Sequence, residues 1–223
     1  MSDHTTVYKE LILRAWVDAQ LPDPLRRQLA RIYAASFPAT GRVDIAVLLA
    51  GADLAQGLLC TAERRGALVG FTYSSPVVGT DVHLLGYVAV DPAHRARGIG
   101  SHLVTFLRHL AATTGTPSGF LVELEPVPAP SHCVGGSPRT PLHFYEHVGA
   151  RRVDCLPDFE VVDSTVDASP RTRLLWLPTG NPEHPARLDG PRLRQSVETI
   201  LTRAHGLDPR DPRLAKILES LAC

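Results

Sequence analysis

The spacing of hydrophobic residues along the chain predicts alternating strands and helices. Apolar residues recur every three or four positions in the helical stretches, whereas strands show alternation or short apolar runs. The patterns predict helices over 23–37, 43–55, 99–114 and 142–149. They predict strands over 7–16, 57–66, 67–77, 81–90, 120–127, 151–162 and 172–180. This order predicts an α/β fold with a mixed sheet.

Residues with special backbone preferences mark several element ends. Asp23 is expected to be an N-cap, with Pro24 at the first helical position. Arg65-Gly66 is expected to form a tight turn between two strands. Gly115 is expected to end the 99–114 helix as a C-cap.

The chain is expected to divide near residue 180, into a main domain over 1–180 and a C-terminal helical extension over 181–223. Apolar residues at helical spacing predict two short helices, over about 191–205 and 211–222. Helices of this length are marginal alone in water, so their apolar faces need a partner. The partner is either the body of the same chain or a second copy, and a homodimer is therefore possible.

Composition narrows the classes of function. The 223 residues are 44% hydrophobic, with 23 basic and 23 acidic residues. The zero net charge argues against a nucleic-acid partner, and the lack of a long apolar run argues against a membrane protein. Neither a signal peptide nor a zinc or disulfide pattern of cysteines is seen, so we expect a cytoplasmic protein without metal. The preference for arginine over lysine suggests a GC-rich bacterial source.

The segment 88–103, VAVDPAHRARGIGSHL, carries the strongest chemical signal. A strand ends at Asp-Pro, two arginines and two glycines follow, and an amphipathic helix begins at once. Unpaired amides at a helix N-terminus bind anions, and two donors beside a glycine suit a diphosphate. The lysine of a P-loop and the third glycine of a dinucleotide fingerprint are both missing.

This segment resembles the GNAT superfamily of acyl-CoA-dependent N-acyltransferases, whose pyrophosphate loop reads Q/R-x-x-G-x-G/A. Here the loop is Arg95-Ala96-Arg97-Gly98-Ile99-Gly100. A second GNAT feature, an aromatic-Tyr-x-x-x-Gly ending of the last core helix, matches residues 144–149. The resemblance covers roughly residues 7–178. It implies a mixed, mostly antiparallel central sheet flanked by helices, and an acetyl-CoA cosubstrate.

The resemblance also implies roles for individual residues. The backbone of Val88, Ala89 and Val90 would contact the pantetheine and acyl carbonyl, and residues 95–101, ending at Ser101, would hold the pyrophosphate. Glu123 would activate the amine, and Tyr145 would protonate the leaving thiolate. The implied function is direct acetyl transfer to a primary amine, in our interpretation that of a small molecule. The long segment 126–141 replaces the asparagine that the family often has after this strand.

Several alternatives stay open at this stage. Glu125 shares a strand face with Glu123, and His83 is another candidate base. His132-Cys133 would allow a covalent route. Arg139 and His143 are candidates for the acceptor entrance. A catalytically silent acyl-CoA-binding module is the alternative to an enzyme.

Overall fold

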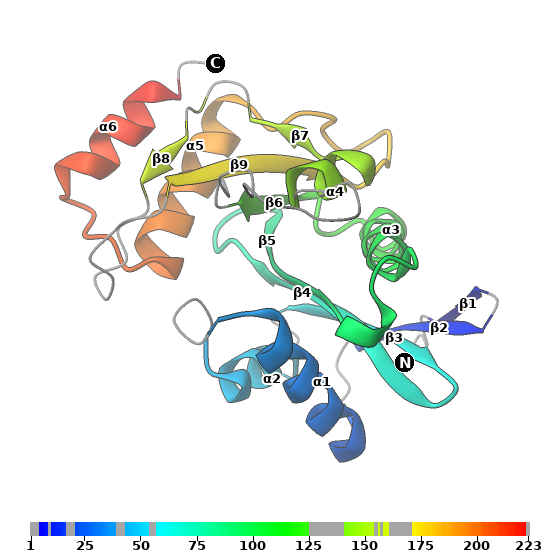
Figure 1. The fold of residues 1–223 in the computed structure, drawn as a ribbon. Coiled ribbons are helices and arrows are strands. Elements are labelled where there is room, and N and C mark those ends of the chain that lie inside the picture. The colour runs from blue at the N-terminus through cyan, green and yellow to red at the C-terminus, as the bar shows by residue number, and fades with distance from the viewer. Residues whose placement is uncertain are drawn as a thin grey trace, which may run out of the picture. The chain divides into compact units, whose positions relative to one another are not determined.

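The computed structural model describes residues 5–8, 10–16, 21–38, 43–53, 57–124, 141–153, 156, 158–160 and 171–221. The chain forms two compact units. The first contains Met1–Pro76 and Leu85–Gly115, and the second contains Val77–Leu84 and Thr116–Cys223. Strand β5 (Val82–Val90) runs through both units, because its first three residues belong to the second. Figure 1 labels the elements.

The sheet of the first unit has the strand order β1-β2-β3-β4-β5. Its first four strands are β1 (Thr5–Tyr8), β2 (Leu11–Trp16), β3 (Leu58–Arg64) and β4 (Ala67–Pro76). Neighbours among these four pair in antiparallel fashion.

The single strand predicted over 7–16 is wrong, because the structure has two strands there. Tyr8 lies opposite Leu11 in a β1–β2 pair. The two strands also differ in burial. All four residues of β1 are exposed, and only β2 buries alternate side chains, at Leu11 and Leu13. The predicted turn between β3 and β4 is confirmed, with positive φ at Arg65 (51°) and Gly66 (77°).

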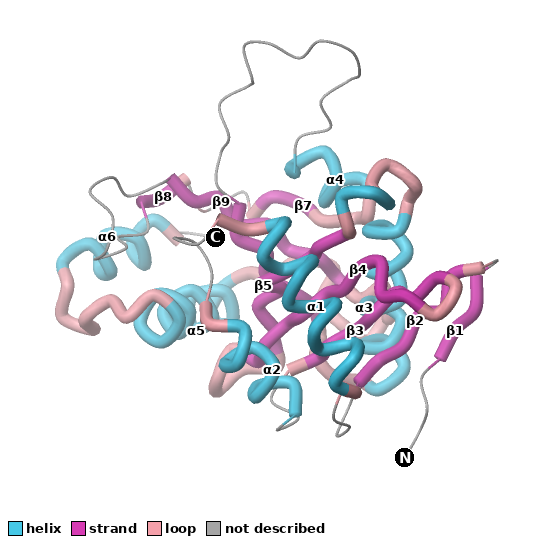
Figure 2. The backbone as a smooth tube through the Cα atoms, turned by 60° about the horizontal axis from the view of Figure 1, so that its bottom comes forward, coloured by secondary structure: helices cyan, strands magenta, loops and turns pink. Residues whose placement is uncertain are grey.

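Three helices cover the sheet of the first unit, and Figures 1 and 2 show α1 and α2 on one face with α3 on the other. They are α1 (Asp23–Ser36), α2 (Ile45–Asp53) and α3 (Ile99–Thr114). The first two helices close a cluster of buried residues against the sheet: Leu21, Leu29, Ile32, Tyr33, Leu48, Leu59, Leu68, Phe71 and Ala89.

The structure confirms one of the two predicted helix caps and contradicts the other. Gly115 ends α3 with a φ of 80°, which confirms the predicted C-cap. The predicted N-cap of α1 is wrong, because Pro22 occupies the cap position and Asp23 is already inside the helix. No side chain caps α1, and Asp23 instead places a negative charge in the first turn, where the helix dipole favours it.

The second unit is built on β6 (Gly119–Leu124) and β9 (Arg171–Pro178). The first residues of β5 pair with β6 in parallel, and β6 pairs with β9 in antiparallel fashion. Parallel neighbours need a crossover connection, which α3 supplies along the chain. The short strands β7 (Arg151–Arg152) and β8 (Phe159–Glu160) pair with β9. The predicted mixed, mostly antiparallel sheet flanked by helices is confirmed.

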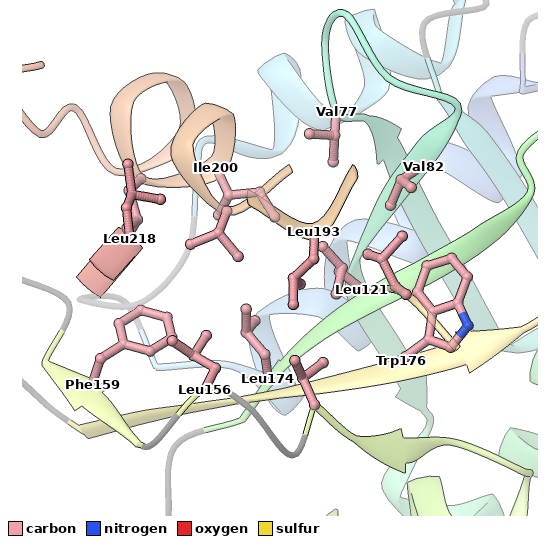
Figure 3. Close-up of a cluster of buried hydrophobic side chains, with 14 of the residues drawn as sticks. Val77, Val82, Leu121, Leu156, Phe159, Leu174, Trp176, Leu193, Ile200 and Leu218 are labelled. Carbon is pink, nitrogen blue, oxygen red and sulfur yellow. The ribbon is translucent and has the colours of Figure 1, made fainter. Parts of the chain in front are cut away.

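The C-terminal helices pack into the core of the second unit. Helix α5 (Gly190–Thr199) continues as the π-helix η3 (Ile200–Ala204), and α6 (Pro212–Ser220) follows. Figure 3 shows their apolar side chains against residues of β6 and β9. The buried residues that these helices and the segment before them contribute are Leu188, Leu193, Val197, Ile200, Leu201, Leu214 and Leu218. The apolar faces predicted from the spacing therefore find their partner in the same chain.

Polar contacts fix α5 to the β4–β5 connection within this unit. The Arg192 guanidinium forms an ion pair with Asp81 and also donates to Ser118 Oγ at 3.0 Å. The Gln195 side-chain amide donates to the Gly79 carbonyl at 3.0 Å. The start of the extension is thus held by charge as well as by apolar packing.

Candidate functional site

Strand β5 leads into the glycine-containing loop through Val88, Ala89 and Val90. Ala89 is buried, whereas its two neighbours are half-buried. The amide of Asp91 still donates to the Val69 carbonyl of β4, at 2.9 Å. The strand is therefore held to its neighbour up to the point where the loop begins.

A buried carboxylate fixes the start of the loop. Asp91 is 8% exposed and accepts a hydrogen bond from the Ala93 amide at 2.9 Å, which caps the 3-10 helix η2 (Pro92–His94). It also accepts from Arg31 Nη2 of α1 at 2.8 Å. Because a partly buried ion pair is less screened than an exposed one, this contact ties the loop firmly to α1.

The two arginines of the loop have different surroundings. Arg95 Nε donates to the Val90 carbonyl at 3.0 Å, and its Nη2 donates to Ser36 Oγ at 3.2 Å. The Arg95 guanidinium thus braces the loop against β5 and α1. Arg97 has no hydrogen-bonded partner within the described part of the chain and remains available to a ligand.

The loop ends in two left-handed residues that expose backbone amides. Ala96 has a φ of 59°, and Gly98, the N-cap of α3, has a φ of 78°. The first helical hydrogen bond runs from the His102 amide to the Gly98 carbonyl, at 3.0 Å. The amides of residues 99–101 precede this bond and have no acceptor among the described residues. Unpaired N–H groups at a helix N-terminus are the kind of donors that bind anions.

A cleft of about 670 Å³ lies beside this loop in the first unit. Its lining residues come from the loop, α3, the β1–β2 connection and the β3–β4 turn: Tyr8, Glu10, Leu11, Arg64, Arg65, Arg97, Ile99 and His102. Glu10 pairs with Arg64 at 3.0 Å and with Arg65 at 3.4 Å. Three arginines against one carboxylate leave the cleft with an excess of positive charge.

Glu123 lies near the end of β6 in the second unit. Its side chain is 20% exposed. Nε2 of His205 lies within hydrogen-bond distance of both carboxylate oxygens, at 2.9 Å and 3.1 Å. The sequence predicted Glu123 as a site residue but gave no indication of His205, which comes from the C-terminal extension.

Tyr145 lies on α4 (Pro141–His147), also in the second unit. Burial raises the pKa of its phenol above the usual value, so the hydroxyl stays protonated at neutral pH. The predicted end of this helix at Gly149 is confirmed by a φ of 97°. The Ala150 amide donates to the Tyr145 carbonyl at 2.9 Å, which closes the last turn.

His83 is poorly suited to be a base at neutral pH. It packs edge-on against Phe120, with ring centroids 6.3 Å apart. Burial lowers its pKa to about 4, so the imidazole is a weak proton acceptor. Of the other candidates, His143 is exposed on α4, while Glu125, His132, Cys133 and Arg139 lie outside the described residues. No group of three or more potential metal ligands occurs within the described ranges.

The family model for the GNAT acetyltransferase domain matches residues 55–149. Residues 55–149 are a GNAT acetyltransferase domain. This domain contains the braced loop, Glu123 and Tyr145. No curated protein sequence matches the chain significantly.

Solved GNAT structures share the fold at low sequence identity. A GNAT-family protein from Bacteroides thetaiotaomicron is 16% identical, with a TM-score of 0.57 over 82% of this chain and 92% of its own. Aminoglycoside 6'-acetyltransferase type Ii is 18% identical, with a TM-score of 0.55 over 72% and 96%. The Salmonella typhimurium protein yncA, solved with acetyl-CoA, is 17% identical, with a TM-score of 0.55 over 79% and 96%.

The predicted site residues lie in both units. The loop residues 95–101 and the end of β5 lie in the first unit, whereas Glu123 and Tyr145 lie in the second. Helices long and apolar enough to span a membrane are not found in the described parts of the chain. His205 is the functional candidate that the sequence missed, because no local pattern links it to Glu123.

Proposed function

We propose that this protein is an N-acetyltransferase that moves the acetyl group of acetyl-CoA to a primary amine of a small molecule. The proposal rests on the loop between β5 and α3, residues 91–98, which the contacts of Asp91 and Arg95 hold in place. Among the described residues, the three amides that follow this loop have no acceptor and Arg97 has no hydrogen-bonded partner, and this donor set suits the pyrophosphate of CoA.

The cleft beside the loop strengthens the assignment to a ligand with several phosphates. CoA bears a 3'-phosphate on its ribose besides the pyrophosphate. Arg64 and Arg65 line the same cleft as Arg97, so they supply further positive charge for an anionic ligand. The backbone of Val88, Ala89 and Val90 is proposed to bind the pantetheine arm and the acyl carbonyl.

Glu123 and Tyr145 supply the two proton transfers that the reaction needs. The amine nitrogen forms a bond to the thioester carbonyl carbon, and the carbon–sulfur bond breaks. Glu123, directly or through a water, takes one proton from the amine, and Tyr145 gives one proton to the leaving thiolate. The products are an amide and free CoA thiol, and water then exchanges the protons on the two side chains.

The ionisation of alkyl amines explains why a carboxylate is useful. With a pKa near 10.4, only about one amine in a thousand or fewer is neutral at pH 7, and only the neutral form attacks. A carboxylate attracts the ammonium form and passes its first proton to water, and it is then free to accept the second proton, which the nitrogen loses as the amide forms. One solved neighbour acts on aminoglycosides, which carry several amines, and such polyamine compounds are suitable first acceptors to test.

Arg97→Ala is expected to weaken acetyl-CoA binding about 10–100-fold, because it removes a charge-assisted hydrogen bond of about 1–3 kcal/mol. Gly98→Val should weaken binding further, since valine strains the left-handed φ of 78° that opens the helix start. Calorimetry measures both affinities. Arg27→Ala is the matched control, because it removes an exposed arginine of α1 in the same unit. Wild-type affinity in both loop variants would contradict the proposed cosubstrate site.

Tyr145→Phe is expected to lower kcat about 10–1000-fold while leaving the affinity for acetyl-CoA unchanged. The phenylalanine keeps the ring packing but has no proton to give to the thiolate. Steady-state release of CoA thiol with a saturating amine measures the effect. A variant with wild-type kcat would remove Tyr145 from the mechanism.

Thiol release from acetyl-CoA with a panel of primary amines, aminoglycosides included, tests the proposed function as a whole. Turnover that depends on an amine supports the enzyme. Tight binding of acetyl-CoA without turnover of any amine would instead support the silent acyl-CoA-binding module, and the proposal of catalysis would be wrong.

A further inference from the structure

The contact between Glu123 and His205 joins the proposed base to the C-terminal extension. The two residues are 82 positions apart in the sequence, yet Nε2 of the imidazole lies 2.9 Å from one carboxylate oxygen and 3.1 Å from the other. Both side chains are largely buried, with 28% of the histidine and 20% of the glutamate exposed. We propose that His205 is a positioning residue for acetyl transfer, which holds the Glu123 carboxylate in the orientation that accepts the amine proton.

The backbone around His205 fixes the imidazole in this place. The His205 amide donates to the Ile200 carbonyl at 3.1 Å, a π-helical bond that closes the last turn of η3. Gly206 then turns the chain with a φ of 69°, which a residue with a side chain adopts only under strain. Single π-turns of this kind are frequent at functional sites.

Apolar anchors on both sides of His205 prevent it from moving away from β6. Leu201, four residues earlier, is 2% exposed in the core of the second unit. Leu207, two residues later, packs against the same core, and its amide donates to the Leu201 carbonyl at 2.9 Å. The position of the imidazole is therefore determined by the packing of the extension and not by the bond to Glu123 alone.

The protonation pattern of the pair follows from the chemistry of its partners. An ionised carboxylate only accepts hydrogen bonds, so Nε2 must carry the proton that lies between the two oxygens. A single N–H shared by both oxygens fixes the plane of the carboxylate. Each oxygen keeps lone pairs that can accept from an amine or from a bridging water.

A fixed carboxylate reacts faster than one that rotates freely. A glutamate has three rotatable side-chain bonds, and ordering such a side chain costs conformational entropy. The contact with His205 orders the Glu123 side chain when the protein folds, before the amine binds. The base is therefore preorganised for proton transfer. This inference rests on the proposed function, because it assigns His205 to the reaction in which Glu123 is the base.

Two substitutions of His205 separate the hydrogen bond from the packing. His205→Gln keeps an N–H donor at nearly the same reach, and His205→Leu keeps bulk but removes the donor. We expect His205→Leu to lower kcat about 10–100-fold, the size of effect that a small misplacement of a catalytic group produces. We expect His205→Gln to stay within about 3-fold of the wild type, since the bond to the carboxylate is restored. Acetyl-CoA affinity and the melting temperature should be those of the wild type in both variants.

A double-mutant cycle with Glu123→Gln decides whether His205 acts through Glu123. If it does, His205→Leu causes less than about a 3-fold further loss of kcat in the Glu123→Gln background. An equal loss in both backgrounds, equal losses for leucine and glutamine, or wild-type kcat in His205→Leu would each overturn the inference while leaving the proposed function intact. A wild-type protein that acetylates no amine in the panel would overturn the proposed function and this inference with it.

Discussion

Glu123→Gln is expected to reduce turnover about 100-fold or more at pH 7 and by much less near pH 10. The glutamine keeps the size of the side chain but does not accept a proton, so the reaction depends on the free amine in solution. That pool grows about tenfold for each pH unit below the amine pKa. At high pH the solvent deprotonates the amine, whereas at neutral pH Glu123 does so.

Initial rates of thiol release across pH 6.5–10 at saturating acetyl-CoA measure this dependence, and melting curves confirm that both proteins stay folded. Glu219→Gln is the matched control, because it neutralises an exposed glutamate of α6 in the same unit. If the loss were equal at every pH, Glu123 would serve structure or substrate binding, and the base would have to be sought elsewhere.

Leu193→Ala is expected to destabilise the protein more than any single change at the proposed site. Leu193 is fully buried in the cluster of Figure 3, where α5 meets β6 and β9. Truncation of a buried leucine costs about 2–5 kcal/mol. For a chain of this length, such a cost lowers the melting temperature by about 5–15 °C. Thermal melting checks the effect, and exposed Glu198→Ala on the same helix should melt like the wild type.

Removal of the whole extension after Gly180 should have a still larger effect. Seven buried side chains of the core are lost: Leu188, Leu193, Val197, Ile200, Leu201, Leu214 and Leu218. At about 1.5–3 kcal/mol each, their burial matches or exceeds the usual net stability of a domain. We therefore expect the cooperative melting of the second unit to disappear. A truncated protein that melts like the wild type would contradict this role, and light scattering on the full chain tests for a homodimer.

The sequence by itself determined the local features of the proposed cosubstrate site. The motif 95–100 predicted a glycine-opened helix start, because the left-handed φ of Gly98 and the amphipathic pattern after it are local properties. The order of strands and helices predicted the mixed sheet, since hydrophobic periodicity reports which faces are buried. The same periodicity predicted the helices of the extension and their need for a partner.

Only the tertiary structure decided what these elements contact. It made Arg95 a brace of the loop and left Arg97 without a hydrogen-bonded partner among the described residues, although both are arginines two positions apart. It divided the predicted strand 7–16 into β1 and β2. The first of these is exposed, and the second buries alternate side chains.

The pairing of His205 with Glu123 shows the limit of the sequence most clearly. A contact across 82 positions depends on how α5, η3 and β6 pack, and no periodicity or motif within either segment encodes it. Apolar spacing predicts that a helix face must be covered, but the shapes of the side chains in the core decide which surface covers it. For this reason the sequence predicted the proposed base, and only the fold supplied the residue that holds it.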